Sequence, residues 1–243
     1  MRLTGEILSQ TRLTDKQRRE MLALMIRHYD NVQADVFLTD LAEKDWVIVL
    51  YDRGGSLCGF STQMLFEVEV EHTPVRALFS GDTVVDRDFW GDPTLSHLWG
   101  QLALRLIDDF SDRELYWFLI SKGFRTYRFL PLFFHEFYPR YDQAIPASFE
   151  NVLDALAVAR FGDLYDPVRR IVPAQPNHYR LKDALAEIPE SRFRDPNVRF
   201  FSDANPFFAA GNELCCLASL TRENFTAAAW RVIGSSPIAL ELS

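Results

Sequence analysis

The middle of the chain joins a strand to a helix through an abrupt corner, and this feature limits the possible folds most strongly. The stretch "VRALFSGDTVV" (75–85) is typical of a strand, and "FWGDPT" (89–94) turns the chain. Asp92 suits the N-cap of the next helix and Pro93 its first position. The packed face of that helix comprises Leu95, Leu98, Trp99, Leu102 and Leu106. Because "LYWFLI" (115–120) is apolar at every position, it predicts a strand covered on both faces, and therefore a right-handed βαβ unit with parallel strands.

The residues before this corner predict two helices and an antiparallel meander. Thr14 and Gln17 have the spacing of a capping box, which predicts a helix start. A second, short helix is expected over 34–44. The segments 46–51 and 57–70 are strands joined by the hairpin turn "DRGGS". With the strand that precedes the corner, they form three consecutive strands.

The residues after the buried strand predict a looser C-terminal part. The expected elements are a helix restarting at Pro131, a helix over 149–161 capped by Ser148 and ended by Gly162, a short helix near 180–186, a strand over 212–220 and a helix over 222–232. We therefore predict a core over 1–146 and a C-terminal extension over 147–243 packed on it.

Composition excludes several classes of protein. The chain has 243 residues, of which 48% are hydrophobic and 25% charged, so it is globular. Its net charge of −8 argues against a general partner of nucleic acid or anionic membranes. There is no apolar run of transmembrane length, and the N-terminus is too polar for a secretion signal. The three cysteines, Cys58, Cys215 and Cys216, have no metal-binding or disulfide spacing, which favours reduced thiols and a cytoplasmic protein without a metal.

The order of elements resembles the GNAT superfamily of N-acyltransferases over roughly residues 10–145. The stretch "TVVDRDFWGDP" stands where that family has its fourth strand and pyrophosphate-binding turn, and "LYWFLISKGFRTYRFL" where it has the fifth strand and the next helix. The resemblance implies an α+β fold with a mixed, mostly antiparallel sheet flanked by helices. It also implies that the fourth and fifth strands splay apart. The pantetheine arm of the donor would then pair with the backbone near Val84 and Val85.

The turn departs from the family pattern. It contains one glycine, Gly91, and two acidic residues, Asp88 and Asp92, near the place of the phosphates. A carboxylate at a helix N-terminus uses the same N–H groups as a phosphate and repels it. Either the donor is therefore an acyl-carrier protein with a single phosphodiester, or a former CoA site no longer functions. Candidates for contact with the donor are Val84, Val85, Arg87, Trp90, Gly91, Ser121 and Lys122. No cofactor is expected to be bound permanently, and the expected co-substrate is acyl-CoA or acyl-phosphopantetheine.

The chain is rich in phenylalanine, with 20 residues. Phe60, Phe66, Phe79, Phe118, Phe129, Phe133 and Phe134 lie on or beside the strands that would line an acyl pocket. Together with the altered turn and the extension, they resemble GNAT-like fatty-acyl transferases and N-acyl amino acid synthases, which implies a medium or long acyl group. The same residues also suit an ordinary apolar core.

Asp82 is the foremost candidate for a general base. It stands within an apolar strand beside Gly81, and burial would raise its pKa into a useful range. Its alternative role is a cap for a neighbouring turn. Ser80 is expected on the same strand face, by the two-residue period. The resemblance gives the acid that protonates the leaving thiolate to a tyrosine after the fifth strand; Tyr127 and Tyr138 are the candidates, with His135 as a further catalytic candidate.

Two functions remain open on the sequence. The first is an N-acyltransferase that moves an acyl group from acyl-CoA or acyl-carrier protein to the amine of a small molecule or peptide. The alternative is a non-catalytic protein on the same scaffold that binds a lipid or a protein partner. A splay between the strands near Val85 and Ser121 is required by the first function.

Overall fold

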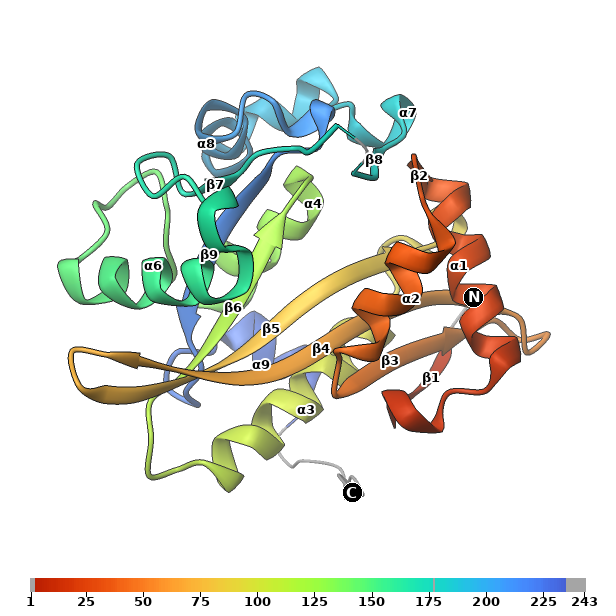
Figure 1. The fold of residues 1–243 in the computed structure, drawn as a ribbon, viewed down its shortest axis with the longest axis horizontal. Coiled ribbons are helices and arrows are strands. Elements are labelled where there is room, and N and C mark those ends of the chain that lie inside the picture. Colours follow the sequence, from red (N-terminus) through yellow and green to blue (C-terminus); the bar gives the residue numbers. More distant parts are fainter. Residues whose placement is uncertain (1–2, 177, 235–243) are drawn as a thin grey trace.

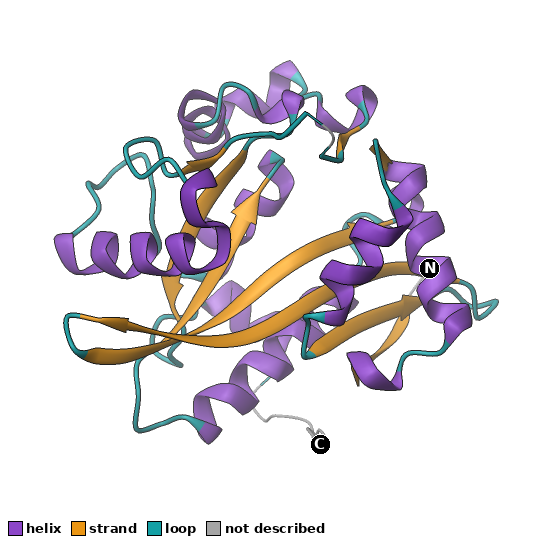
Figure 2. Cartoon of the chain, viewed as in Figure 1, coloured by secondary structure: helices purple, strands orange, loops and turns teal. Residues whose placement is uncertain are grey.

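The protein is built around one mixed, mostly antiparallel β-sheet, seen in a computed structural model that describes residues 3–176 and 178–234 (Figure 2). Its seven strands lie in the order β1-β3-β4-β5-β6-β9-β7. They are β1 (Thr4–Ser9), β3 (Trp46–Tyr51), β4 (Leu57–Val70), β5 (Thr73–Val85), β6 (Leu115–Ser121), β9 (Glu213–Ser219) and β7 (Ile171–Val172). Only β5 and β6 pair in parallel, and β2 (Tyr29–Asp30) pairs with β8 (Arg180–Leu181) in a separate ribbon. The predicted fold class is confirmed.

Helices cover both faces of the sheet (Figure 1). They are α1 (Asp15–His28), α2 (Ala34–Ala42), α3 (Thr94–Asp109), α4 (Phe124–Tyr127), α5 (Phe129–Phe133), α6 (Ala147–Phe161), α7 (Asp183–Ala186), α8 (Pro196–Ala204) and α9 (Ala227–Ile233). The largest apolar cluster lies on the face that α3 and α9 cover. On the opposite face, α1 and α2 cover the half with β3, while α6 covers the half with β6 and β9. Among the described residues, no helix has the length and apolarity needed to cross a bilayer.

The predicted start of α1 is confirmed, whereas the predicted start of α3 is displaced by one residue. Thr14 and Gln17 form both bonds of the capping box, with the Gln17 amide 3.2 Å from Thr14 Oγ1 and the Thr14 amide 2.8 Å from Gln17 Oε1. At α3 the Asp92 carboxylate accepts from the Thr94 amide at 2.9 Å, as predicted, but the N-cap position belongs to Pro93 and not to Asp92. The helix begins one residue later than predicted, because Pro93 precedes its first turn.

The parallel pair β5–β6 is paired over only part of its length. Its register runs from Arg76 opposite Leu115 to Ser80 opposite Leu119, and there it stops. Beyond this point β5 continues to Val85 beside β4, while β6 continues to Ser121 beside β9. Figure 1 shows the two strands diverging. The predicted splay is confirmed.

A β-bulge lies at the start of the splay. The register between β4 and β5 shifts between Ser61 and Gln63, so that Thr62 stands opposite both Gly81 and Asp82. Continuous alternation placed Ser80 and Asp82 on one face, and this expectation is wrong. The extra residue turns Asp82 to the α1 face, whereas the Ser80 side chain bonds to Trp117 on the α3 face.

Some C-terminal elements differ from expectation. Helix α6 begins at Ala147 after Pro146, so Ser148 is inside the helix and not its cap, while Gly162 ends it at φ +56 as predicted. Pro131 lies inside α5 and does not begin it. Strand β9 pairs with β6, so residues of the extension complete the main sheet. Strand β1 and helix α8 were not predicted, since "TGEILS" and "PNVRFFSDA" are too short and too mixed for a clear period. Residues 235–243 of the predicted extension lie outside the described part of the chain.

Candidate active site

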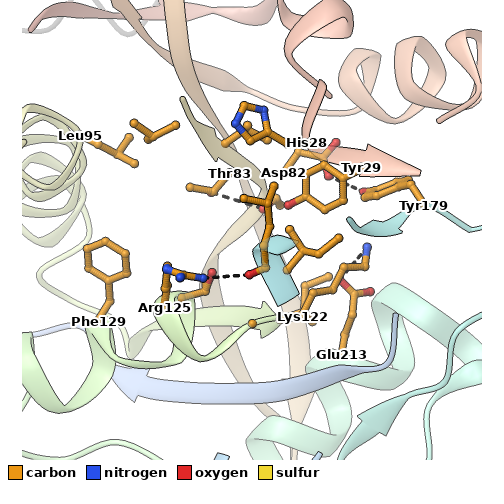
Figure 3. A pocket seen from close by; sticks show the side chains of 18 of the residues that line it. His28, Tyr29, Asp82, Thr83, Leu95, Lys122, Arg125, Phe129, Tyr179 and Glu213 are labelled. Atoms are coloured by element: carbon orange, nitrogen blue, oxygen red, sulfur yellow. Dashed lines mark hydrogen bonds and ion pairs between the residues drawn. The ribbon is translucent and has the colours of Figure 1, made fainter. Parts of the chain in front are cut away.

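A cavity of about 460 Å³ opens where β5 and β6 diverge. Its walls come from distant parts of the sequence, as Figure 3 shows. They include the end of β5, the turn before α3, the ends of α1 and β6, and the segment around Tyr179 in the C-terminal part. The bulge and the splay therefore create the space, and the C-terminal part encloses it.

Asp82 lies in the cavity wall and accepts a hydrogen bond from the Tyr179 hydroxyl (Figure 3). Burial raises the pKa of Asp82 to about 6, and the charge of nearby Asp40 acts in the same direction. The bond from Tyr179 and the charges of Lys122 and Lys44 only partly oppose this rise. A carboxyl with a pKa near neutrality, facing a cavity, is suited to accept a proton.

Tyr179 is a fixed hydrogen-bond donor to that carboxyl. Its ring packs edge-on against Tyr29, with ring centroids 5.4 Å apart, and the Lys122 Nζ lies 3.8 Å from its ring centroid. Burial, with the negative charge of Asp82, raises the pKa of Tyr179 well above its usual range. The phenol therefore stays protonated at neutral pH. Tyr179 was missed from the sequence, because it lies 97 positions from Asp82 in a stretch without periodic pattern.

Lys122 lies in the cavity wall but already has a partner. Its ammonium is 3.2 Å from the Glu213 carboxylate, and each side chain is only 9% exposed. The pair joins the end of β6 to the start of β9. Ser121, the other candidate at this strand end, is fully buried and does not line the cavity.

A second charged group lies at the cavity's α2 side. Asp40 accepts hydrogen bonds from Lys44 and from Arg160, both at 2.7 Å. Arg160 is also 3.1 Å from Glu43. In contrast, the Asp82 carboxylate forms no ion pair among the described residues, and its hydrogen-bond partner is an uncharged phenol. Asp82 is thus the carboxylate best placed to meet an incoming cation.

The donor-side candidates Val84, Val85, Trp90 and Gly91 all line the cavity. The indole N–H of Trp90 donates to the Val85 carbonyl at 2.9 Å and so fixes the ring beside the strand. The Arg125 guanidinium lies 4.2 Å from the centroid of this ring.

Arg87 does not line the cavity itself, but its guanidinium lies 5.7 Å from the Trp90 ring centroid. Burial, then the positive charges of Arg87 and Arg192, lower the pKa of Arg125. Among the described residues, no carboxylate lies within ion-pair distance of Arg87 or Arg125. Two guanidiniums without carboxylate partners on one indole ring form a site suited to an anion.

The other catalytic candidates lie away from the cavity. Tyr127 is fully buried, and its hydroxyl donates to the Pro139 carbonyl at 2.9 Å within a cluster of aromatic rings. Tyr138 is also fully buried, and its hydroxyl reaches Glu136 at 3.2 Å. His135 is exposed on a loop, with its backbone amide bonded to Asn224. The structure does not bring these three side chains to Asp82.

The aromatic residues divide between cavity and core. Of those predicted for an acyl pocket, Phe79 and Phe129 line the cavity. The remaining five, Phe60, Phe66, Phe118, Phe133 and Phe134, pack in the apolar clusters instead. Phe161 from α6, which was not predicted, packs edge-on against Phe79 and also lines the cavity. No cluster of histidine, cysteine and acidic side chains in the described ranges could hold a metal ion.

The comparisons with known proteins give only partial structural likenesses. No family model and no curated protein matches the chain. A probable N-acyltransferase of Enterococcus faecalis V583 is 14% identical, over 55% of this chain and 33% of its own, with a TM-score of 0.42. The GNAT family N-acetyltransferase YhbS of Escherichia coli, solved with CoA, is 16% identical over 53% of this chain and 68% of its own, with a TM-score of 0.39. N-myristoyltransferase of Saccharomyces cerevisiae with bound myristoyl-CoA is 14% identical over 49% of this chain and 31% of its own, with a TM-score of 0.38.

The chain thus spans about a third of the length of the first and third of these proteins. Likeness of this degree assigns neither family nor activity.

Proposed function

We propose that the protein is a GNAT-like N-acyltransferase. It moves an acyl group from a phosphopantetheine thioester, carried by CoA or by an acyl-carrier protein, to an amine of a small molecule or peptide. The observation that supports this most is the cavity between the diverging strands, which has a proton acceptor in its wall. Beyond Ser80, the edge of β5 on the side of β6 pairs with no strand of the described chain, and it offers backbone groups to an amide-containing arm.

The backbone of Val85 faces the gap. The Asp86 amide donates to the Cys58 carbonyl on β4 at 2.8 Å. Since hydrogen-bonded and non-bonded pairs alternate along an antiparallel ladder, the polar groups of Val84 point to β4 and those of Val85 point away from it. The Val85 carbonyl already bonds to Trp90, which leaves its N–H for the amide carbonyls of a pantetheine arm.

The donor's phosphate is expected on arginine side chains and not on the turn amides. Asp92 already binds the Thr94 amide and, at 3.1 Å, the Leu3 amide, so it blocks part of the helix N-terminus. Arg125 and Arg87 beside Trp90 supply positive charge nearby. A single phosphate suits this small site. We therefore expect free CoA to bind more weakly than an acylated carrier or a long acyl-CoA.

Changing Arg125 to methionine should weaken binding of phosphopantetheine about 10- to 100-fold, the usual worth of a hydrogen bond to a charged group. Methionine keeps the apolar contact with the indole but removes the charge. Arg128→Met is the matched control, because this exposed arginine pairs with Asp195 outside the cavity. Calorimetric titration measures both variants. Equal affinity for the Arg125 variant and the control would show that the phosphate lies elsewhere.

Asp82 is proposed to accept the proton of the attacking amine. The amine nitrogen forms the new bond to the thioester carbon, its proton passes to the carboxylate, and the C–S electron pair leaves with the sulfur. The base must be ionised, so activity should increase with pH through the Asp82 pKa of about 6.

The pH profile of kcat/KM gives a second test of this assignment. The Tyr179 hydrogen bond stabilises the ionised carboxylate and so lowers its pKa. Tyr179→Phe should therefore move the ascending limb of the profile to higher pH, with a smaller effect on the rate at high pH. If the variant is folded and its ascending limb stays at the native pH, ionisation of Asp82 is not the cause of that limb.

The preferred acyl group is proposed to be of medium or long chain, in contact with Phe79 and Phe161 in the cavity wall. Incubation with phosphopantetheine thioesters of increasing chain length and a panel of amines, read by mass spectrometry, tests both substrates. Amide products would establish the transferase. Tight binding of the thioesters or of fatty acids without any product would favour the non-catalytic alternative.

A further inference from the structure

Five polar side chains form a continuous hydrogen-bonded chain across the α3 face of the sheet. The indole N–H of Trp117 donates to Ser80 Oγ at 2.9 Å, and Ser80 Oγ lies 2.7 Å from Gln63 Oε1. Gln63 Nε2 lies 2.8 Å from Ser61 Oγ, which is 2.6 Å from Thr83 Oγ1. The first four side chains are all buried, and the last lines the cavity. The chain therefore connects the apolar core to the candidate site.

The direction of every bond in this chain follows from its first member. An indole nitrogen can only donate, so Ser80 accepts from Trp117. Ser80 donates its own hydrogen to Gln63 Oε1, because the flipped amide would leave that buried hydrogen without an acceptor. The Gln63 oxygen therefore faces Ser80, and its amide nitrogen donates to Ser61. The Ser61 hydrogen then has one partner among the described residues, the Thr83 oxygen. The opposite direction at this step would leave a buried hydroxyl hydrogen without an acceptor, which is costly.

The Thr83 hydroxyl is consequently an acceptor within the chain and has its own hydrogen free for another partner. The Gly81 carbonyl, at 3.5 Å, is too distant for a strong bond. Successive bonds in one direction also polarise one another and strengthen the final donor. The buried chain thus presents a polarised O–H at the edge of the cavity.

Thr83 lies on the face of β5 opposite to Asp82. Val84 packs in the cluster under α1 and α2, while Val85 packs against the α3 cluster. By the two-residue period, Asp82 shares the face of Val84 and Thr83 shares that of Val85. Adjacent residues therefore present a base on one side of the strand and a hydrogen-bond donor on the other.

We propose that Thr83 is a catalytic residue that stabilises the leaving thiolate, and that the chain from Trp117 keeps its hydroxyl turned toward the donor sulfur. This inference rests on the proposed acyl transfer. When the C–S bond breaks, its electron pair stays on sulfur, and Thr83 holds the thiolate by a hydrogen bond without losing its proton. The amine proton goes to Asp82, and the released thiolate takes a proton from solvent. No tyrosine in the described wall other than Tyr29 and Tyr179 is available, and both lie on the Asp82 side.

The thiol of bound phosphopantetheine gives a direct readout, because its thiolate absorbs in the ultraviolet. In the native protein the bound thiol should titrate at lower pH than the free thiol. Thr83→Val, which is similar in shape but lacks the hydroxyl, should raise this midpoint by about one pH unit, since it removes a hydrogen bond to the charged form. Thr83→Ser should restore the native value. Ser61→Ala breaks the chain one step away and should give an intermediate midpoint.

Acyl transfer completes the test. Thr83→Val should slow transfer from an alkyl thioester about 100-fold, the loss found for one preorganised donor, and slow transfer from an aryl thioester much less. This difference arises because the aryl thiolate needs less stabilisation. Suppose that the native protein transfers acyl groups and that the valine variant binds phosphopantetheine. If the variant then has the native thiol midpoint and the native transfer rates, Thr83 is not the hydrogen-bond donor to the thiolate. Failure of the native protein to bind phosphopantetheine or transfer any acyl group would instead overturn the proposed function, and this inference with it.

Discussion

Asp82→Asn is expected to reduce acyl transfer about 10²- to 10⁴-fold, the usual contribution of a positioned general base. The amide has nearly the shape of the carboxyl and can keep the contact with Tyr179, so the fold should be retained. Burial raises the pKa of Asp82, which means that the ionised group opposes folding at neutral pH. The melting temperature of the variant at pH 7 should therefore hold or increase while turnover falls.

Asp154→Asn is a matched control for this variant. Asp154 also accepts from a tyrosine, Tyr165, at 2.6 Å, but neither residue lines the cavity. Loss of one such pair should leave transfer near the native rate. If Asp82→Asn transfers acyl groups as fast as this control, Asp82 is a structural residue and the base lies elsewhere.

Glu213→Leu is expected to destabilise the protein by about 3 kcal/mol, because it leaves the buried Lys122 ammonium without its partner. This value is at the lower end of the range for a broken buried pair, since the carboxylate of Asp82 also lies near Lys122. The double variant Lys122→Met with Glu213→Leu removes both charges and should recover most of the stability. Denaturant unfolding of the native protein and the variants measures these differences.

A loss below about 1 kcal/mol in the single variant would contradict a buried pair and indicate a solvated one. Equal stability of the single and double variants would show that the unpaired lysine ammonium does not cause the loss of stability in Glu213→Leu. Either result would show that the Lys122–Glu213 pair does not stabilise the contact between β6 and β9 as a buried ion pair.

Local patterns in the sequence were sufficient for the elements that form the site's frame. The capping box at Thr14, the meander and the buried strand each depend on neighbours within a few residues, and the structure confirms them. The parallel pairing of β5 and β6 follows from the helix that connects them. Its splay was implied by the family resemblance and not by the residues alone.

The composition of the site depended on contacts that no local pattern encodes. Tyr179 and Glu213 reach the cavity from a loop and a strand end without periodicity, and Arg160 reaches it from the end of the predicted helix α6, whose packing direction no local pattern gives. The bulge at Gly81 changed which strand face Asp82 occupies, because alternation assumes an uninterrupted register. Tyr127 and Tyr138 were selected by position after the buried strand, yet their rings serve the core.

In the proposed complex, the donor's arm passes between β5 and β6, and its thioester lies between Thr83 and Asp82. A crystal structure with a thioether analogue of acyl-phosphopantetheine, which cannot transfer its acyl group, tests this directly. We expect the arm in the gap, with one of its amide carbonyls on the Val85 N–H and the phosphate beside Arg125 and Trp90. An analogue bound elsewhere on the surface, with the cavity between the strands unoccupied, would contradict it.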